Sequence, residues 1–144
     1  MKTQKAIPFE IINLDDDGYH LMVKGKVNHH ECNLILDTGA SKTALDKGFI
    51  SEVIGADDLK KVEKLSSGLG TNEMEIHEIL VKEFYIDSHI FHHYEVAVIE
   101  LTHVNFAYEK MNLEKIQGII GNDILVKHNA LIDYKNKQLW LDPL

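Results

Sequence analysis

The residues best suited to chemistry lie where an apolar segment ends in an acid. The run from Leu34 to Leu36 is followed at once by Asp37, Thr38 and Gly39. Placing a carboxylate at the end of a segment that could complete a hydrophobic core costs free energy, so an acid at this point indicates a functional role. Thr38 adds a hydroxyl group that can brace the turn from behind. The chemistry indicated is acid–base catalysis.

A single carboxylate cannot both activate a water molecule and protonate an amide leaving group. Two carboxylates that share one proton can do so, because like charges about 3 Å apart cannot both ionise and their titrations are pushed apart. Gly39 has no Cβ, so two such loops can approach closely and the turn can take an unusual φ. The Asp-Thr-Gly triplet occurs once in this chain. A site with two carboxylates therefore needs a second copy of Asp37 from another chain.

A second segment, Gly-Ile-Ile-Gly-Asn-Asp-Ile-Leu at positions 118–125, follows later in the chain. Two final apolar stretches, around Leu131 and Leu139, come after it. In this order the segments resemble those of the retropepsin-like aspartic proteases. The resemblance implies an all-β fold with one or two short helices, a closed acid-protease barrel with one lobe per chain. It also implies that residues 1–144 form a single domain and that the protein is a homodimer with a twofold axis.

The resemblance also implies roles for individual residues. Asp37 is the expected catalytic acid, Thr38 is expected to bond across to the partner's loop, and Gly39 allows the close approach of the two loops. The segment Ile119-Ile120-Gly121 is expected to pack beside the catalytic loop. Asp123 lies on the helix that follows and is expected to be structural rather than catalytic.

A glycine-rich stretch lies between these two segments. Gly68, Leu69 and Gly70 stand where the family has a β-hairpin flap that folds over the substrate. Such a tip must open and close, and its backbone must come within hydrogen-bonding reach of a peptide. An ordinary surface turn uses the same residue types. The position of the stretch favours the flap, which we expect to bind substrate.

Alternating apolar and polar residues predict mostly strands. The expected strands are 8–13, 19–27, 32–36, 62–65, 74–81, 84–86, 93–99, 130–134 and 138–141. Apolar spacing from His103 to Lys115 predicts a helix. A short helix is also expected over 122–127, with Asn122 as its N-cap, and a helical turn over 44–50.

The composition, 44% hydrophobic and 26% charged, is typical of a soluble globular protein. A net charge of −8 argues against nucleic acid or an anionic membrane as a partner. Residues 1–9 lack the apolar region of a signal peptide, and no apolar run reaches the roughly 18 residues of a membrane span. Cys32 is the only cysteine, which excludes an internal disulfide and fits a reducing compartment. These features predict a cytoplasmic protein.

No cofactor or metal is expected. The nine histidines are His20, His29, His30, His77, His89, His92, His93, His103 and His128. They show neither His-Glu-x-x-His nor the short spacings of zinc ligands with cysteine. A phosphate-binding loop at Lys42-Thr43 is excluded, because Ser41 stands where a glycine must precede the lysine.

The function expected from the resemblance is that of an aspartic endopeptidase. Two Asp37 carboxylates, one ionised and one protonated, would hold the attacking water, and an extended peptide or protein would be the substrate. The alternative is a dimeric peptide-binding or scaffolding module on the same fold, with little or no turnover. A third reading is a small β-barrel with an incidental Asp-Thr-Gly. The sequence does not indicate the cleavage preference.

Overall fold

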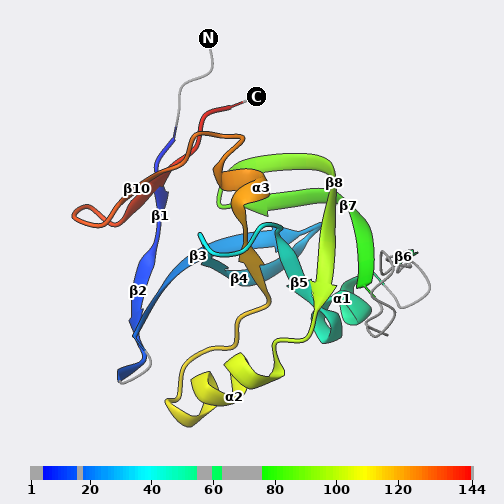
Figure 1. Ribbon diagram of the computed structural model, residues 1–144, viewed down its shortest axis with the longest axis horizontal. Helices are drawn as coiled ribbons and strands as arrows, with labels where there is room; N and C mark the ends of the chain where they lie inside the picture. Colours follow the sequence, from blue (N-terminus) through cyan, green and yellow to red (C-terminus); the bar gives the residue numbers. More distant parts are fainter. Residues whose placement is uncertain (1–4, 16–17, 55–59, 63–75, 144) are drawn as a thin grey trace, which may run out of the picture.

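Six strands of this chain close into a barrel (Figure 1). The structure is a computed structural model that describes residues 5–15, 18–54, 60–62 and 76–143. An eight-stranded sheet is ordered β2-β3-β4-β9-β5-β8-β7-β6, and an additional pairing of β3 with β7 closes its inner six strands. The barrel strands are β3 (Tyr19–Val27), β4 (His30–Leu36), β9 (Gly118–Ile120), β5 (Ala44–Asp46), β8 (His89–Ile99) and β7 (Ile76–Ile86). This confirms the predicted mainly β fold with a closed barrel.

The other strands extend the barrel at two places. Strands β2 (Glu10–Asn13) and β6 (Lys60–Val62) are the ends of the eight-stranded sheet, and β1 (Ile7–Pro8), β11 (Gln138–Trp140) and β10 (Leu131–Asp133) form a second sheet in that order. Figure 1 shows this second sheet beside the barrel, at the side where both ends of the chain lie. In the described ranges the helices are short: α1 (Lys47–Val53), α2 (Thr102–Lys110) and α3 (Asn122–Leu125).

Buried apolar residues fall into two clusters. The larger fills the barrel and includes Leu34, Phe84 and Ile120, each 0% exposed. The smaller lies between the outer face of the sheet and α2, where Tyr108 of the helix packs with Met22, Ile35 and Ile116. The end of strand β4 is buried on both faces, with Leu34 and Leu36 in the larger cluster and Ile35 in the smaller, which explains why these three residues form a continuous apolar run. Asp37 follows this strand directly.

Strand β7 corrects the prediction of two separate strands at 74–81 and 84–86. The structure has one strand, Ile76–Ile86, paired with β8 through most of its length. The burial alternation breaks between Val81 and Phe84, which are both fully buried. Opposite the break, His93 has a positive φ of 50°. The buried positions therefore switch from odd to even residue numbers within one continuous strand. A search for strict alternation of apolar and polar residues does not predict this.

The expected helical turn at 44–50 is also corrected. Residues 44–46 are strand β5, placed between β8 and β9, and helix α1 begins at Lys47. Asp46 is the N-cap of α1, since its Oδ2 accepts from the backbone N–H of Phe49 at 3.2 Å. Its Oδ1 accepts from the N–H of Leu101 at 3.0 Å. One side chain thus joins the start of α1 to the residue that precedes α2.

Helix α2 confirms the predicted helical segment but is shorter. It ends at Lys110, two residues before Asn112, whose φ of 56° lies in the left-handed region. Residues 113–117 continue to β9 without helical structure. Asn105 fixes this return, because its side chain accepts from the N–H of Ile116 at 2.8 Å and donates to the carbonyl of Ile116 at 2.9 Å. Within the described parts of the chain, none of the helices has the length and apolar character needed to cross a membrane.

Candidate active site

Asp37 lies at the end of β4, in a turn held by backbone hydrogen bonds. Its N–H donates to the carbonyl of Ile120 at 2.9 Å. Its Oδ1 accepts from the N–H of Gly39 at 3.0 Å, and its carbonyl accepts from the N–H of Ala40 at 3.1 Å. Asp37 is partly buried, whereas Thr38 and Gly39 are exposed. The carboxylate is therefore oriented by the turn, and the two residues beside it remain accessible.

The segment after β9 holds this turn from the other side. Strands β4 and β9 run parallel, with Leu36 opposite Ile120. The N–H of Asn122 donates to the carbonyl of Ala40 at 2.8 Å, and the N–H of Asp123 donates to the carbonyl of Ser41 at 3.2 Å. The expectation that Ile119-Ile120-Gly121 packs beside the Asp-Thr-Gly turn is confirmed.

Asn122 has a different role from the predicted N-cap. The N-cap of α3 is Gly121, without a side-chain cap bond. The Asn122 side chain instead donates from Nδ2 to the carbonyl oxygen of Thr38 at 2.7 Å. The N-cap prediction was therefore wrong, because a tertiary contact to the loop 84 residues away takes up the side chain that a local cap would have used.

The two glycines of the site are needed for space rather than for unusual backbone angles. Gly39 does not have a positive φ, which corrects the expectation for this turn. A Cβ at Gly39 would lie 3.3 Å from Oδ1 of Asp37. A Cβ at Gly121 would lie 2.6 Å from the carbonyl carbon of Lys42, which is closer than real contacts allow. Gly121 thus lets the two segments pack backbone against backbone.

A buried hydrogen-bond network lies under the loop. Thr43 is 0% exposed. Oδ1 of Asp123 accepts from the backbone N–H of Thr43 at 2.9 Å and from its Oγ1 at 2.8 Å, and Thr43 Oγ1 accepts from the N–H of Gly121 at 3.1 Å. The hydroxyl of Tyr94 donates to Oδ2 of Asp123 at 2.7 Å. Burial, followed by the bond to Asp123, raises the pKa of Tyr94. Asp123 thus has the structural role expected of it.

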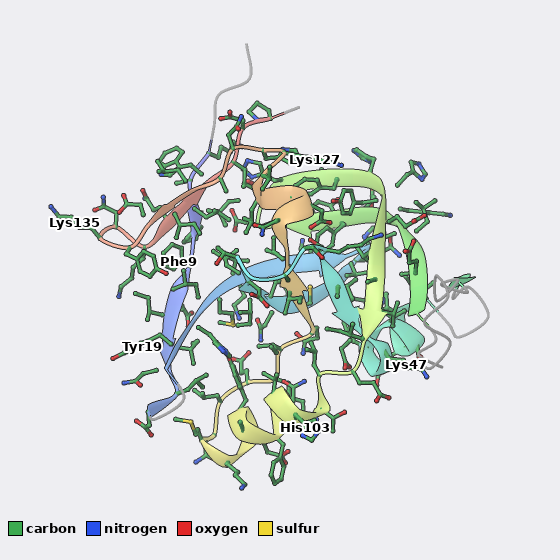
Figure 2. The ribbon with its side chains drawn as sticks, viewed as in Figure 1. Phe9, Tyr19, Lys47, His103, Lys127 and Lys135 are labelled. Atoms are coloured by element: carbon green, nitrogen blue, oxygen red, sulfur yellow. The ribbon has the colours of Figure 1, made fainter. Side chains whose placement is uncertain are left out.

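A cavity of about 380 Å³ opens at Asp37. Its lining includes Asp37 and Thr38 from the turn, together with His20, Leu101, Val104 and Tyr134. Tyr19, labelled at the left of Figure 2, is next to His20 at the start of β3 and lines the same cavity. A larger and more open hollow of about 850 Å³ is lined by residues such as Lys24 and Tyr85 and does not include Asp37. The smaller cavity is therefore the candidate site.

His20 is a site residue that the sequence did not reveal. Its Nδ1 lies 2.7 Å from the hydroxyl of Tyr108, and the two rings stack with centroids 5.8 Å apart. Burial lowers the pKa of His20, while the nearby Asp37 carboxylate acts in the opposite direction. Because 88 residues separate His20 from Tyr108, no local spacing could have indicated the pair.

The predicted flap residues, Gly68, Leu69 and Gly70, lie outside the described residues. The strands on either side are described: β6 pairs antiparallel with β7, with Lys60 opposite Glu78. Lys42, near the end of the Asp-Thr-Gly turn, forms an ion pair with Glu78 at 3.4 Å. The start of β7 is thus tied to the segment that carries Asp37.

In the part of the chain that the structure describes, no group of three or more histidine, cysteine or acidic side chains is arranged to hold a metal ion. Cys32 is buried, which raises the pKa of its thiol to about 12. Its thiol is therefore protonated at neutral pH and is not an activated nucleophile.

Replacing Asn122 with alanine should loosen the Asp-Thr-Gly turn without unfolding the protein. The change removes the 2.7 Å bond to the Thr38 carbonyl but keeps the backbone bond to Ala40. We expect a loss of about 1 kcal/mol in the free energy of unfolding, measured by chemical denaturation at fixed protein concentration. Asn136→Ala is the matched control, because its amide bonds Asp133 in an exposed turn elsewhere. Greater amide-exchange protection near Thr38 in Asn122→Ala would contradict this role.

Comparisons with known proteins agree with this geometry. The family model described as "Aspartyl protease" matches residues 23–124. A search of curated proteins finds no match. Among solved structures, the retroviral protease-like domain of Ddi1 from Leishmania major superposes with a TM-score of 0.60 at 20% identity, covering 87% of this chain and 90% of that one. A retropepsin-like aspartic protease from Rickettsia conorii gives a TM-score of 0.59 at 19% identity, covering 99% of this chain and 96% of that one. These two likenesses concern the fold.

Proposed function

Because this chain belongs to the aspartyl protease family, we propose that it is an endopeptidase whose site contains two Asp37 carboxylates at the axis of a homodimer. One observation carries the proposal. The Gly39 N–H bonds the Asp37 carboxylate, and the Ile120 carbonyl accepts from the Asp37 backbone N–H, so Asp37 is held in the lining of a cavity while Thr38 and Gly39 remain exposed beside it. This arrangement suits a turn that meets its own copy.

The chemistry follows from bringing the two turns together. Of two adjacent carboxylates, one keeps a proton and the other is ionised. The ionised Asp37 takes a proton from a water molecule as the water attacks the scissile carbonyl carbon. The protonated Asp37 hydrogen-bonds the developing oxyanion and then supplies the proton that the leaving amine needs. Thr38, exposed in a single chain, can direct its hydroxyl to the partner's turn and hold the two loops in register.

The second sheet offers a surface for the partner copy. Strand β10 is one of the two edge strands of this sheet, with β1 as the other, and has one described neighbour, β11. Leu131, on β10, is 62% exposed, and Tyr134, just after it, is 63% exposed. Exposed apolar side chains on an open edge strand are typical of a surface that pairs with another chain. We place the dimer contact at β10 because Tyr134 also lines the cavity that contains Asp37.

Leu131→Lys should weaken the dimer. The lysine places a charge on the edge strand, and across a twofold contact it meets its own copy. We expect the dissociation constant to rise by about tenfold or more, measured by sedimentation or light scattering across a dilution series. Ile90→Lys is the matched control, because Ile90 is an exposed apolar residue of β8, outside the second sheet. Equal dimer affinity in both variants would place the contact elsewhere.

Cleavage of a peptide library between about pH 3.5 and about pH 7.5 tests the proposed activity, with molar mass recorded on the same samples. Cleavage by a dimer supports the proposal, and the cut sites then define the specificity. A well-folded dimer that binds peptides without cutting any of them would favour the alternative function, a peptide-binding module. A monomer at every concentration and pH would overturn the shared site.

A further inference from the structure

The cavity at Asp37 contains one imidazole whose surroundings are unusual. His20 lies near the start of β3, and Tyr108 lies in α2, far along the sequence. The two meet through a bond of 2.7 Å between His20 Nδ1 and the Tyr108 hydroxyl. Tyr108 is only 1% exposed, so it is a fixed support. Helix α2 therefore supplies the group that orients the His20 ring.

Tyr108 can hold this ring in both of its charge states. Burial raises the pKa of the Tyr108 phenol to about 12, so the hydroxyl stays protonated throughout the working range. A hydroxyl can donate to the unprotonated Nδ1 of a neutral imidazole, and it can accept from the N–H of the cation. The contact thus survives titration of His20.

Among the residues that the structure describes, few other titratable groups surround His20. Asp37 and Tyr134 line the cavity with it, Tyr19 precedes it on β3, and Tyr108 contacts it from α2. Across the sheet, His20 pairs with Ile12 of β2, which carries no charge. Asp37 is therefore the acid whose charge acts on His20, and the two side chains line one cavity.

We propose that His20 is a positioning residue of the Asp37 site: oriented by Tyr108, it places an imidazole that becomes cationic in mild acid beside the carboxylates. This inference rests on the proposed function. A cation beside the two Asp37 carboxylates stabilises their singly ionised form relative to the form in which both are protonated. The reaction needs that singly charged form, so His20 extends activity toward lower pH. At higher pH His20 is neutral and does not stabilise the singly ionised form. No stabilisation is needed there, because one Asp37 carboxylate stays ionised without it.

Burial of His20 also makes the stability of the protein depend on pH. Burial lowers the pKa of His20 from 6.5 in the folded protein, so the unfolded chain binds this proton more readily. The free energy of unfolding therefore decreases as pH falls below about 6.5, and the loss is complete below the folded pKa. Asp37 limits the loss, because its charge favours the cation.

The first test measures the His20 pKa directly, by NMR titration of the imidazole carbon-bound protons in the intact protein. Asp37→Asn should lower the pKa of His20 further, by about half a unit or more. Asp87→Asn is the matched control: the same chemical change should lower the pKa of His89, which Asp87 raises, and leave His20 unchanged. An unchanged His20 pKa in Asp37→Asn would overturn the inference, whether or not the protein cleaves peptides.

The second test uses the pH profile of kcat/KM. His20→Gln should move the acid limb of the profile upward by about half a pH unit, while His103→Gln should leave it in place. His103, labelled in Figure 2, lies on α2 but is exposed.

Tyr108→Phe keeps the ring stack and removes the hydroxyl, so Asp37→Asn in that background should shift the His20 pKa by less. An acid limb that stays fixed in His20→Gln would contradict the proposed coupling even if cleavage is normal. Absent cleavage with an intact NMR coupling would count against the proposed function alone.

Discussion

Asparagine in place of Asp37 should abolish peptide hydrolysis and reduce kcat/KM by at least about a thousandfold, equivalent to roughly 4 kcal/mol of transition-state stabilisation. An amide can neither accept the proton of the attacking water nor supply a proton to the leaving amine. Asparagine keeps an oxygen that can accept from the Gly39 N–H, the bond that Asp37 Oδ1 makes at 3.0 Å. The turn should therefore keep its shape, and circular dichroism and molar mass should match the unsubstituted protein.

Mixed dimers make this prediction sharper. If each site needs both Asp37 carboxylates, a dimer with one Asp37→Asn chain is inactive. After the two chains are mixed and allowed to exchange, activity should fall with the square of the unsubstituted fraction. A linear fall would mean that each chain contains a complete site, which contradicts the shared mechanism. Asp87→Asn, mixed in the same way, should leave activity unchanged, because Asp87 lies at an exposed turn between β7 and β8.

The sequence was sufficient for the parts of the site that are local. Asp37 could be found because a strand buried on both faces must be apolar, and an acid directly after it stands out. The parallel packing of β9 beside β4 could be expected only through the resemblance, since pairing between positions 34–36 and 118–120 leaves no periodic signal. Most of the strands followed from alternation, which reflects burial of one face, whereas the closed barrel was expected only through the resemblance.

The misses share one physical cause, which is that tertiary contacts outweigh local rules. Asn122 has the residue type of a helix N-cap, yet its amide bonds the Thr38 carbonyl. Val81 and Phe84 break the alternation of buried residues in β7. The strand continues past this break, and His93 of β8, which has a positive φ, lies opposite it. His20 lines the site from β3, and the residue that contacts its ring, Tyr108 of α2, lies 88 residues away in the sequence.

Thr43 shows how the Asp-Thr-Gly turn is kept in place. It follows the turn and immediately precedes β5, and its carbonyl accepts from the N–H of Ala97 at 3.0 Å. Its hydroxyl both donates to Asp123 and accepts from the N–H of Gly121. One buried side chain thus joins the segment after Asp37 to the segment after β9. The position of the Asp37 carboxylate depends on these same two segments.

Thr43→Val should be the most destabilising small change in this region, costing about 3 kcal/mol in the free energy of unfolding. Valine has nearly the same shape, so the loss comes from the hydroxyl: the buried N–H of Gly121 is left without its acceptor, and Asp123 loses one donor. Thr43→Ser is the matched control, because it keeps the hydroxyl and removes only a buried methyl group, for about 1 kcal/mol. Both are measured by chemical denaturation at one protein concentration, since the proposed dimer would make stability depend on concentration. If serine costs as much as valine, packing of the methyl group rather than the hydrogen-bond network holds the two segments together, and the role assigned to the Thr43 hydroxyl is wrong.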